Sequence, residues 1–380
     1  MLYLDNAATT PVRPEVLEAM APYLTRAYGN PSSHHTIGEA AADALEDART
    51  RIAAVLGMRR TDIVFTSGGT EANNLAVKGI AIAAHQRRGA RHVLTTPIEH
   101  ESVLESADYL HRIHGFDVTY VPVDRAARVD PAEIGRALRD DTALVSIGWA
   151  NNEVGTVQDV AAIAAIAAER GIPLHLDAVQ AAGWLPLSVE PGVAAVSVAG
   201  HKIGAPKGTG VLGVRGRIPL EPLLHGGGQE RGRRSGTPDV AGAVALATAL
   251  DMAAAERAAS APRVAALRDA FIAHVLAAVP SATLTGDAVH RLPGTASFTF
   301  AGTSGEAVLL ELERRGVVSS SGSACAAGSD EPSHVLLAMG VAPEVAQTAV
   351  RFTFPHDLDQ PLDAVAAAVA ASVAAVRSGG

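Results

Sequence analysis

The amino-acid sequence predicts an α/β protein with a mainly parallel central sheet and a smaller α+β domain toward its C-terminus. Short apolar runs bounded by glycine or proline are typical of strands buried on both faces, and they alternate with stretches of helical periodicity. Beyond residue 260, helices and strands follow in a different order. We therefore expect a large domain over residues 14–259 and a small domain over residues 260–380 together with residues 1–13.

The large domain is expected to begin with helices over residues 14–24 and 39–56, and Gly57 is expected to end the second helix. Alternating strands and helices follow. The expected strands cover residues 63–65, 92–95, 118–123, 143–149, 173–176, 194–198 and 211–214, and the helices between them start near residues 71, 101, 131 and 160.

An alanine-rich helix starting at Val240 is expected to end near Pro262, because proline lacks the backbone N–H that a helix interior needs. This break sets the predicted domain boundary. The small domain is then expected to contain a helix over residues 263–279, strands over 282–284 and 296–300, a helix over 306–315, a strand over 350–354 and a C-terminal helix.

The composition is that of a globular protein, with 380 residues of which 48% are hydrophobic and 19% charged. The net charge of -9 argues against a direct nucleic-acid partner. The apolar runs are too short to span a bilayer, and the N-terminus lacks the pattern of a signal peptide. The single cysteine, Cys325, excludes an intrachain disulfide and fits a reducing cytoplasm. We therefore expect a cytoplasmic protein without a membrane anchor.

Lys202 lies in a turn between two apolar runs and is flanked by His201, glycine and proline rather than by solvated charges. Burying an ammonium is costly, so a buried lysine is usually paired or chemically employed. A lysine that loses its charge becomes an amine nucleophile, which can form a Schiff base with an aldehyde cofactor. On this segment alone, a surface loop with two lysines is the simpler interpretation.

Other polar groups follow the predicted strands. The turn at Gly69 and Thr70 opens a helix and suits a phosphate, Asp177 ends a strand, and His100 and Asn152 follow two more strands. Each of these has an ordinary structural interpretation when it is taken alone. A pyridoxal cofactor, however, needs both a Schiff-base lysine and an acid opposite its ring nitrogen. The convergence of these strand ends therefore predicts a pyridoxal phosphate site.

Cys325 lies in a run of small residues from 319 to 329, which favours an exposed and mobile thiol over a structural cysteine. A thiol with an ordinary pKa of about 8.5 is a strong nucleophile even when only a few per cent is ionised near neutral pH. Arg351, on the final strand, has the planar group that binds a carboxylate with two hydrogen bonds. A partly exposed arginine at a strand end is the alternative.

Taken together, these residues resemble the class V aminotransferase family of pyridoxal-phosphate enzymes, and within it the cysteine desulfurases of the NifS/IscS type. The resemblance extends in order from residue 3 to about residue 351. The matching stretches cover residues 3–11, 29–33, 66–71, 99–100, 151–155, 177–180, 200–202, 226–231, 234–238 and 321–325.

The resemblance implies a fold-type-I homodimer that binds pyridoxal 5'-phosphate. Lys202 would form the Schiff base and move the substrate's Cα proton, and Asp177 would pair with the ring nitrogen. Gln180 would bond the ring hydroxyl, and His100 would stack on the ring and take part in catalysis. The residues expected to hold the phosphate are Gly69, Thr70 and His201, with Thr237 reaching in from the partner subunit.

For the substrate, the resemblance implies that Asn152 and Arg351 orient the carboxylate of L-cysteine. Cys325 would attack the substrate's sulfur, leaving L-alanine and an enzyme persulfide. That sulfur would pass to an iron–sulfur scaffold or a sulfur-carrier protein. A selenocysteine lyase or another class V aminotransferase-type enzyme is the alternative, in which Cys325 would be dispensable. A non-catalytic interaction protein on the same fold would bind no cofactor.

Two positions depart from the family pattern. Ala199 stands where relatives often carry a phosphate-binding serine, which removes one expected hydrogen bond. After Arg351, the segment Thr353-Phe354-Pro355 replaces a hydroxyl-Leu-Gly sequence, and proline removes a backbone donor behind the expected carboxylate site.

Overall fold

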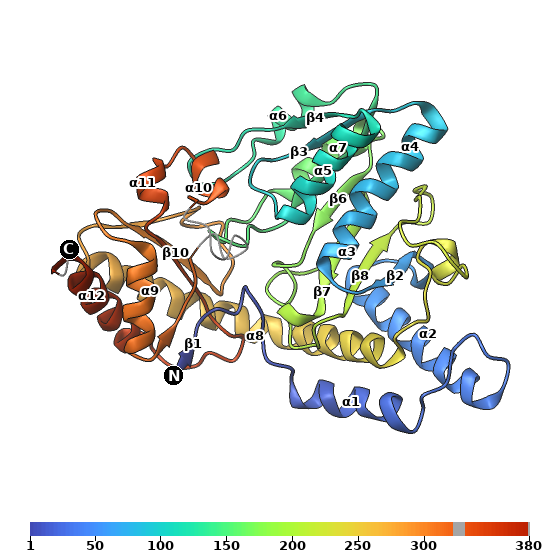
Figure 1. Cartoon of the computed structure of the whole chain (residues 1–380), viewed down its shortest axis with the longest axis horizontal. Coiled ribbons are helices and arrows are strands. Elements are labelled where there is room, and N and C mark those ends of the chain that lie inside the picture. Colours follow the sequence, from blue (N-terminus) through green and yellow to red (C-terminus); the bar gives the residue numbers. More distant parts are fainter. Residues whose placement is uncertain (322–330, 379–380) are drawn as a thin grey trace.

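The computed structural model describes residues 1–321 and 331–378, which form a large α/β unit and a smaller α+β unit joined by one long helix (Figure 1). The predicted fold class is confirmed. Cys325 lies outside the described residues. Within the described ranges, no helix combines the length and apolar character needed to cross a membrane.

The central sheet has seven strands in the order β2-β8-β7-β6-β5-β3-β4. The five strands from β7 to β4 are parallel, whereas β8 pairs antiparallel with both β7 and β2. The strands are β2 (Ile63–Thr66), β3 (His92–Thr95), β4 (Asp117–Tyr120), β5 (Thr142–Gly148), β6 (Leu174–Asp177), β7 (Val193–Ala199) and β8 (Gly210–Val214).

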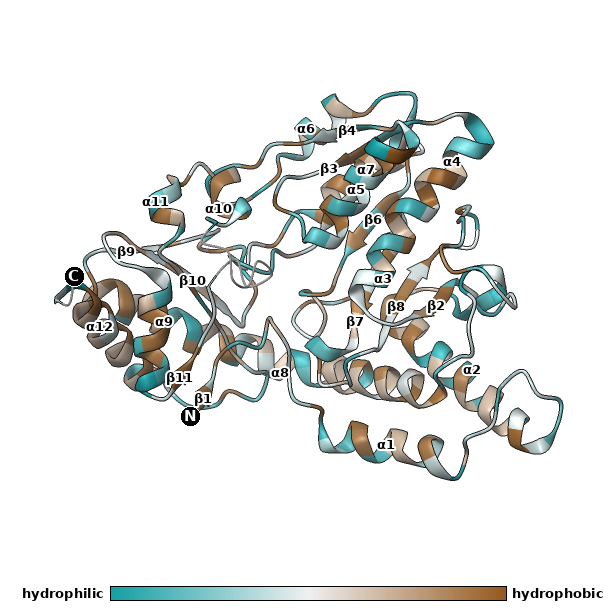
Figure 2. Ribbon diagram, in the orientation of Figure 1, coloured by the Kyte–Doolittle hydropathy of each residue, from teal (hydrophilic) through white to brown (hydrophobic). Residues whose placement is uncertain are grey.

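Helices cover both faces of this sheet, so the large unit has three layers. The strands between them are hydrophobic along most of their length (Figure 2), and β7 is buried at every position. One face packs against α1 (Pro14–Thr25), α2 (Thr36–Leu56), α6 (Pro131–Ala137), α7 (Val160–Glu169) and the first part of α8 (Val240–Ala278). The other face packs against α3 (Gly69–Asn74), α4 (Ile80–Arg88) and α5 (Glu101–His114).

The small unit is built on a three-stranded antiparallel sheet with an aromatic core. The ring of Phe271 packs edge-on against Phe298 and Phe352, with centroid distances of 6.0 and 5.2 Å. Its elements are β9 (Ala282–Leu284), β10 (Thr295–Phe300), β12 (Ala349–Thr353), α9 (Gly305–Arg314), α10 (His334–Ala338), α11 (Pro343–Ala346), α12 (Asp363–Ser378), and the short pair β1 (Leu2–Tyr3) and β11 (Val317–Val318).

The expectation that a helix ends near Pro262 is wrong, because α8 continues through this proline to Ala278. A proline inside a helix removes one hydrogen bond and crowds the preceding turn. Here the following turns bury Val264, Phe271 and Val275 in the small unit's core, and that burial outweighs the local cost. The helix expected over residues 263–279 is therefore the second half of α8, which runs from one unit into the other (Figure 1).

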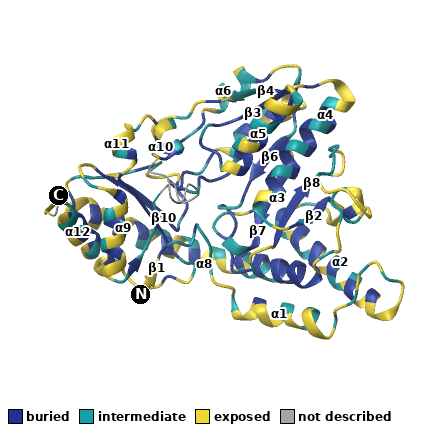
Figure 3. Ribbon diagram, viewed as in Figure 1, coloured by how far each residue is buried: buried dark blue, intermediate teal, exposed yellow. Residues whose placement is uncertain are grey.

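The carboxyl ends of the parallel strands meet at one edge of the sheet, which is where open α/β sheets bind their ligands. The strands of the central sheet are largely buried, as their dark-blue colour in Figure 3 shows, and an acid, Glu99, is buried at this edge between β3 and α5. Its carboxyl group accepts hydrogen bonds from the Thr96 hydroxyl at 2.5 Å and the Gly148 N–H at 2.6 Å. Burial nevertheless raises the pKa of Glu99 to about 8, with a further contribution from the nearby Asp177 carboxylate.

This raised pKa predicts a stability that depends on pH. The unfolded chain releases the Glu99 proton above about pH 4.5, whereas the folded chain retains it to about pH 8, so stability falls as pH rises between these values. Glu99→Gln keeps a neutral group of the same shape and removes this dependence. In urea unfolding, the variant's advantage over the wild type is expected to grow from pH 5 to pH 8, by on the order of a few kcal/mol.

The matched control is Glu105→Gln, which removes an exposed carboxylate from the same helix, α5. The control's pH profile is expected to follow that of the wild type. If the free energies of unfolding of Glu99→Gln and the wild type changed with pH in the same way, Glu99 would be ionised in the folded protein across this range.

Candidate active site

A cavity of about 370 Å³ lies at the carboxyl edge of the central sheet, where the large and small units meet. Its lining comes from the loops after β3, β5, β6 and β7, from the start of α3, and from β12. The predicted site residues that line it are Gly69, Thr70, His100, Asn152, Asp177, Gln180, His201, Lys202 and Arg351.

Lys202 is held in a short 3-10 turn, Gly200–Lys202, between β7 and β8. The turn is closed by a hydrogen bond of 2.9 Å from the Gly200 N–H to the Thr209 carbonyl. The Nζ atom donates to the carbonyl oxygens of Ala7 and Ala8, at 2.8 Å for Ala8. The amine is therefore half-buried on the cavity wall and fixed by the N-terminal segment, which the sequence did not predict.

Asp177 ends β6 and is 8% exposed. One carboxylate oxygen accepts the Val179 N–H at 3.0 Å, and the other accepts the Asn73 side-chain amide at 2.7 Å. Gln180, on the following turn, donates its side-chain N–H to the Ala7 carbonyl at 3.1 Å. The acid is thus oriented from both sides, at the position where a parallel sheet presents its ligand-binding groups.

His100 precedes the first turn of α5, where its ring caps the helix. The backbone N–H of Ser102 donates to Nδ1 at 3.0 Å, and the Ser102 hydroxyl lies 2.8 Å from the same atom. Because a backbone N–H can only donate, Nδ1 is an acceptor, and the hydrogen of the neutral ring is on Nε2. The cap therefore sets both the tautomer and the position of the ring.

The turn before α3 forms the other end of the site, and it opens into a hollow lined also by His201 and Lys207. A Cβ atom on Gly69 would lie 2.8 Å from a methyl of Val179, so only glycine fits at this close approach. Burial lowers the pKa of His201 to about 4, and the charges of Lys202 and Lys207 lower it further. His201 is thus a neutral hydrogen-bonding group near neutral pH.

Thr237 does not line this cavity within one subunit. It borders a separate hollow of about 160 Å³ together with Arg234 and Asp239. Arg234 forms an ion pair of 2.8 Å with Glu71, which lies in the first turn of α3. The arrival of Thr237 from a partner subunit stays a prediction.

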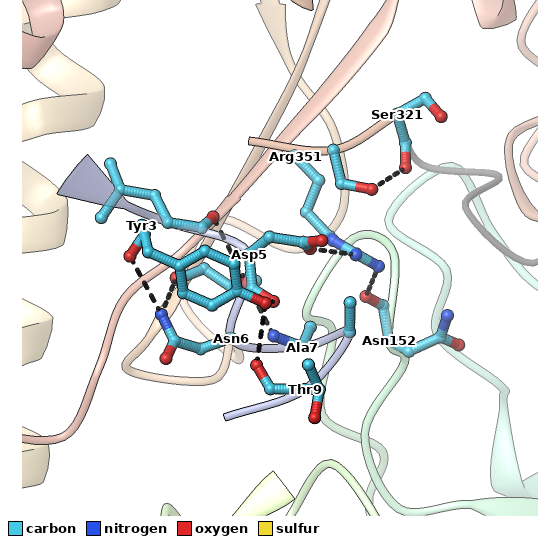
Figure 4. Close-up of polar contacts among 12 residues, drawn as sticks. Tyr3, Asp5, Asn6, Ala7, Thr9, Asn152, Ser321 and Arg351 are labelled. Carbon is cyan, nitrogen blue, oxygen red and sulfur yellow. Dashed lines mark hydrogen bonds and ion pairs between the residues drawn. The ribbon is translucent and has the colours of Figure 1, made fainter. Parts of the chain in front are cut away.

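Arg351 lies on the cavity wall with its guanidinium between two oxygen atoms (Figure 4). It donates to the Asn152 carbonyl at 2.9 Å and to the Asp5 carboxylate at 2.8 Å. Arg351 is 2% exposed, so the alternative of a partly exposed strand-end arginine is wrong. Its Nε atom is buried and has no hydrogen-bond partner within residues 1–321 and 331–378.

The segment Thr353-Phe354-Pro355, which departs from the family pattern, holds the N-terminal segment against β12. The Thr353 hydroxyl accepts the Ala7 N–H at 2.8 Å, and the Phe354 N–H donates to the Gly294 carbonyl at 2.8 Å. These hydrogen bonds lie ahead of Pro355. The missing donor of proline therefore leaves them intact.

The described residues on both sides of the Cys325 segment are attached next to the cavity. Ser320 exchanges two backbone hydrogen bonds with Arg351, at 3.1 and 2.7 Å. On the other side, the Ser333 hydroxyl donates to the Glu153 carboxyl group at 2.5 Å. Burial raises the pKa of Glu153, and the hydrogen bond ties Ser333 to the loop after β5.

Some site residues were missed in the sequence, among them Glu99, Ser102 and Asn73. Glu99 and Ser102 lie within two residues of His100, and Asn73 lies three residues after Thr70. The only signal for Glu99 was its place beside the histidine. Nothing in the sequence distinguished Asn73 from its neighbour Asn74, because the role of Asn73 depends on which helix face meets the sheet.

The residues present fit pyridoxal 5'-phosphate. The cavity offers a lysine amine, a buried carboxylate held by two donors, and an imidazole with a fixed tautomer. At its other end, Gly69 leaves room for close approach and the N–H groups of α3 are directed outward. Lysine for the aldehyde, acid for the ring nitrogen and N–H donors for the phosphate are the groups that this cofactor requires.

Comparison with known proteins identifies the family. The family model described as "Aminotransferase class-V" matches residues 2–360. The cysteine desulfurase IscS of Dictyoglomus turgidum is 44% identical over 368 residues, which cover 95% of this chain and 93% of that protein. The IscS-like cysteine desulfurase of Mycobacterium tuberculosis is 46% identical over 383 residues, covering 97% and 96%.

Comparison with solved structures leads to the same family. A NifS-like protein superposes with a TM-score of 0.88 at 36% identity, covering 99% of this chain and 98% of that one. SspA in complex with cysteine superposes with a TM-score of 0.82, also at 36% identity, covering 93% and 99%. The chain therefore belongs to the class V aminotransferase family and, within it, to the cysteine desulfurases.

Proposed function

We propose that this protein is a pyridoxal-phosphate-dependent cysteine desulfurase that converts L-cysteine to L-alanine and transfers the sulfur to Cys325 as a persulfide. The observation that carries this proposal is the convergence of Lys202, Asp177, His100 and Arg351 on one cavity between the two units. The names of the relatives and the cysteine bound by the structurally similar SspA support the same substrate.

When bound, pyridoxal phosphate supplies an aldehyde for the amino group and a ring that accepts electrons from the bonds at Cα. Asp177, held by Val179 and Asn73, would keep a proton on the ring nitrogen. His100 would stack on the ring. Lys202, whose Nζ atom is placed on the cavity wall by the Ala7 and Ala8 carbonyl groups, would move the substrate's Cα proton.

The phosphate would be held mainly by neutral donors. Gly69 and Thr70 would offer backbone N–H groups at the start of α3, and His201 would add an uncharged ring. Thr237 would join them from the partner subunit of a homodimer, and Gln180 would bond the ring hydroxyl.

The substrate carboxylate is bound by Arg351 and Asn152. Arg351 is pre-oriented by Asp5, so little side-chain entropy is lost when the carboxylate arrives. The Cys325 thiolate attacks the substrate's sulfur and the carbon–sulfur bond breaks, with its electron pair remaining on the carbon. Protonation of that carbon completes L-alanine, so the step needs no outside oxidant.

The persulfide on Cys325 is then passed to an iron–sulfur scaffold or a sulfur-carrier protein in the cytoplasm. The run of small residues around Cys325 in the sequence supports this second role, because reactive thiols are often carried by loops of this composition. The net charge of -9 disfavours direct transfer to a nucleic acid.

Cys325→Ser tests the reaction. The variant is expected to bind pyridoxal phosphate and to show the cysteine-induced change in its visible spectrum, because the cofactor residues are intact. It is expected to form no persulfide and to release no alanine above background. Alanine is measured by chromatography and the persulfide by mass spectrometry of the peptide that contains residue 325. Undiminished turnover would favour the alternative enzyme classes, in which this cysteine is dispensable.

Arg351→Lys tests the carboxylate site. A guanidinium can form two parallel hydrogen bonds with a carboxylate and an ammonium cannot, so the KM for L-cysteine is expected to rise by about tenfold or more. The absorbance of the bound cofactor is expected to stay unchanged. Arg315→Lys, at the end of α9, is the control for loss of a guanidinium elsewhere. An unchanged KM in Arg351→Lys would assign carboxylate binding to other residues.

A further inference from the structure

The side-chain amide of Asn73 connects the predicted cofactor residues. Asn73 is 1% exposed and lies on α3, whose neighbours are α5 and the sheet (Figure 1). Its Nδ2 atom donates to the Asp177 carboxylate at 2.7 Å and to the Ser102 hydroxyl at 2.9 Å. Both hydrogens of the amide are therefore used on residues that line the cavity.

The orientation of this amide is determined by its partners. An ionised carboxylate only accepts hydrogen bonds, so the NH₂ end of Asn73 must face Asp177. The opposite end, Oδ1, is buried and has no hydrogen-bond partner in the part of the chain that the structure describes. An unpaired buried oxygen costs stability. In this orientation the Nδ2 atom of Asn73 is hydrogen-bonded to Asp177, whereas its Oδ1 atom is left without a hydrogen bond.

Asn73 also reaches His100 through Ser102. The Ser102 hydroxyl accepts from Asn73 and can donate its own hydrogen to Nδ1 of His100, 2.8 Å away. The Ser102 N–H holds the same nitrogen at 3.0 Å. The acid for the ring nitrogen and the ring that stacks on the cofactor are therefore linked by one amide and one hydroxyl.

We propose that Asn73 is a positioning residue for the cofactor's ring, because it fixes the rotation of the Asp177 carboxylate and steadies His100 through Ser102. This inference rests on the proposed function. Val179 holds only one oxygen of Asp177, so the carboxylate can turn away from the ring nitrogen when the Asn73 donor is removed. Asn73 does not contact the reacting atoms, and its effect is transmitted through Asp177 and His100.

The test compares Asn73→Leu with the wild type and with Asn74→Leu. Leucine has nearly the same shape as asparagine, and it removes both the donor and the unpaired oxygen. Asn74 is its sequence neighbour and donates its side-chain amide to the Thr70 carbonyl rather than to Asp177, so it serves as the matched control. Asn73→Ala is a second variant if leucine prevents folding, which circular dichroism of each protein will show.

Asn73→Leu is expected to bind pyridoxal phosphate about tenfold more weakly, as loss of a charge-assisted hydrogen bond implies. The pH at which the ring nitrogen of the bound cofactor loses its proton, followed by NMR with ¹⁵N-labelled cofactor, is expected to fall by about one unit. At saturating cofactor, kcat is expected to fall while the KM for L-cysteine stays unchanged.

Wild-type affinity and an unchanged ring-nitrogen titration in both Asn73 variants would overturn the inference. The same changes in Asn74→Leu would also overturn it, because they would reflect a general weakening of the helix. Failure of the proposed function is a separate result. It would appear in the wild type as absence of a coloured cofactor adduct or of alanine from L-cysteine.

Discussion

The site depends on the N-terminal segment of residues 5–8, which lies between the two units and is hydrogen-bonded to both. On one side, two of its carbonyl groups accept hydrogen bonds from the Lys202 amine. On the other side, its Ala7 N–H donates to Thr353 and its Asp5 carboxylate pairs with Arg351. The lysine and the arginine belong to different units and are far apart in the sequence. The shared segment therefore fixes the position of the lysine relative to the arginine, as the proposed binding of one substrate by both residues would require.

Burial shifts the pKa values of two titratable groups in the site toward the neutral form. Burial lowers the pKa of His201 to about 4 and raises the pKa of Glu99 to about 8, so both side chains are mainly neutral at pH 7. A dianionic phosphate would then rely on helix N–H groups and neutral donors. Ala199 has no hydroxyl, so one hydrogen bond expected for the phosphate would be missing at this position.

Much of the fold could be predicted from the sequence because the strands are continuous apolar runs and the helices have clear periodicity. The prediction failed at Pro262, where burial on both sides of the proline carries α8 across the expected break. Short elements such as α10 and α11 were also missed, because four or five residues carry too little periodic signal. For the site, strand ends were informative, since parallel strands place their carboxyl ends at one edge. The contacts of Asn73 and Asp5 were not predictable, because they depend on which segments become neighbours.

Arg351 contacts both the cavity wall and the last described residues before residue 322. Its side chain faces the cavity between Asp5 and Asn152, while its backbone pairs with Ser320 just before the segment that carries the cysteine. A strand residue cannot shift its backbone without moving its side chain. Ser320 is therefore held by the same residue that is proposed to bind the substrate carboxylate. On the other side of residues 322–330, the hydrogen bond of Ser333 to Glu153 holds the chain near the same cavity, because Glu153 follows Asn152 directly.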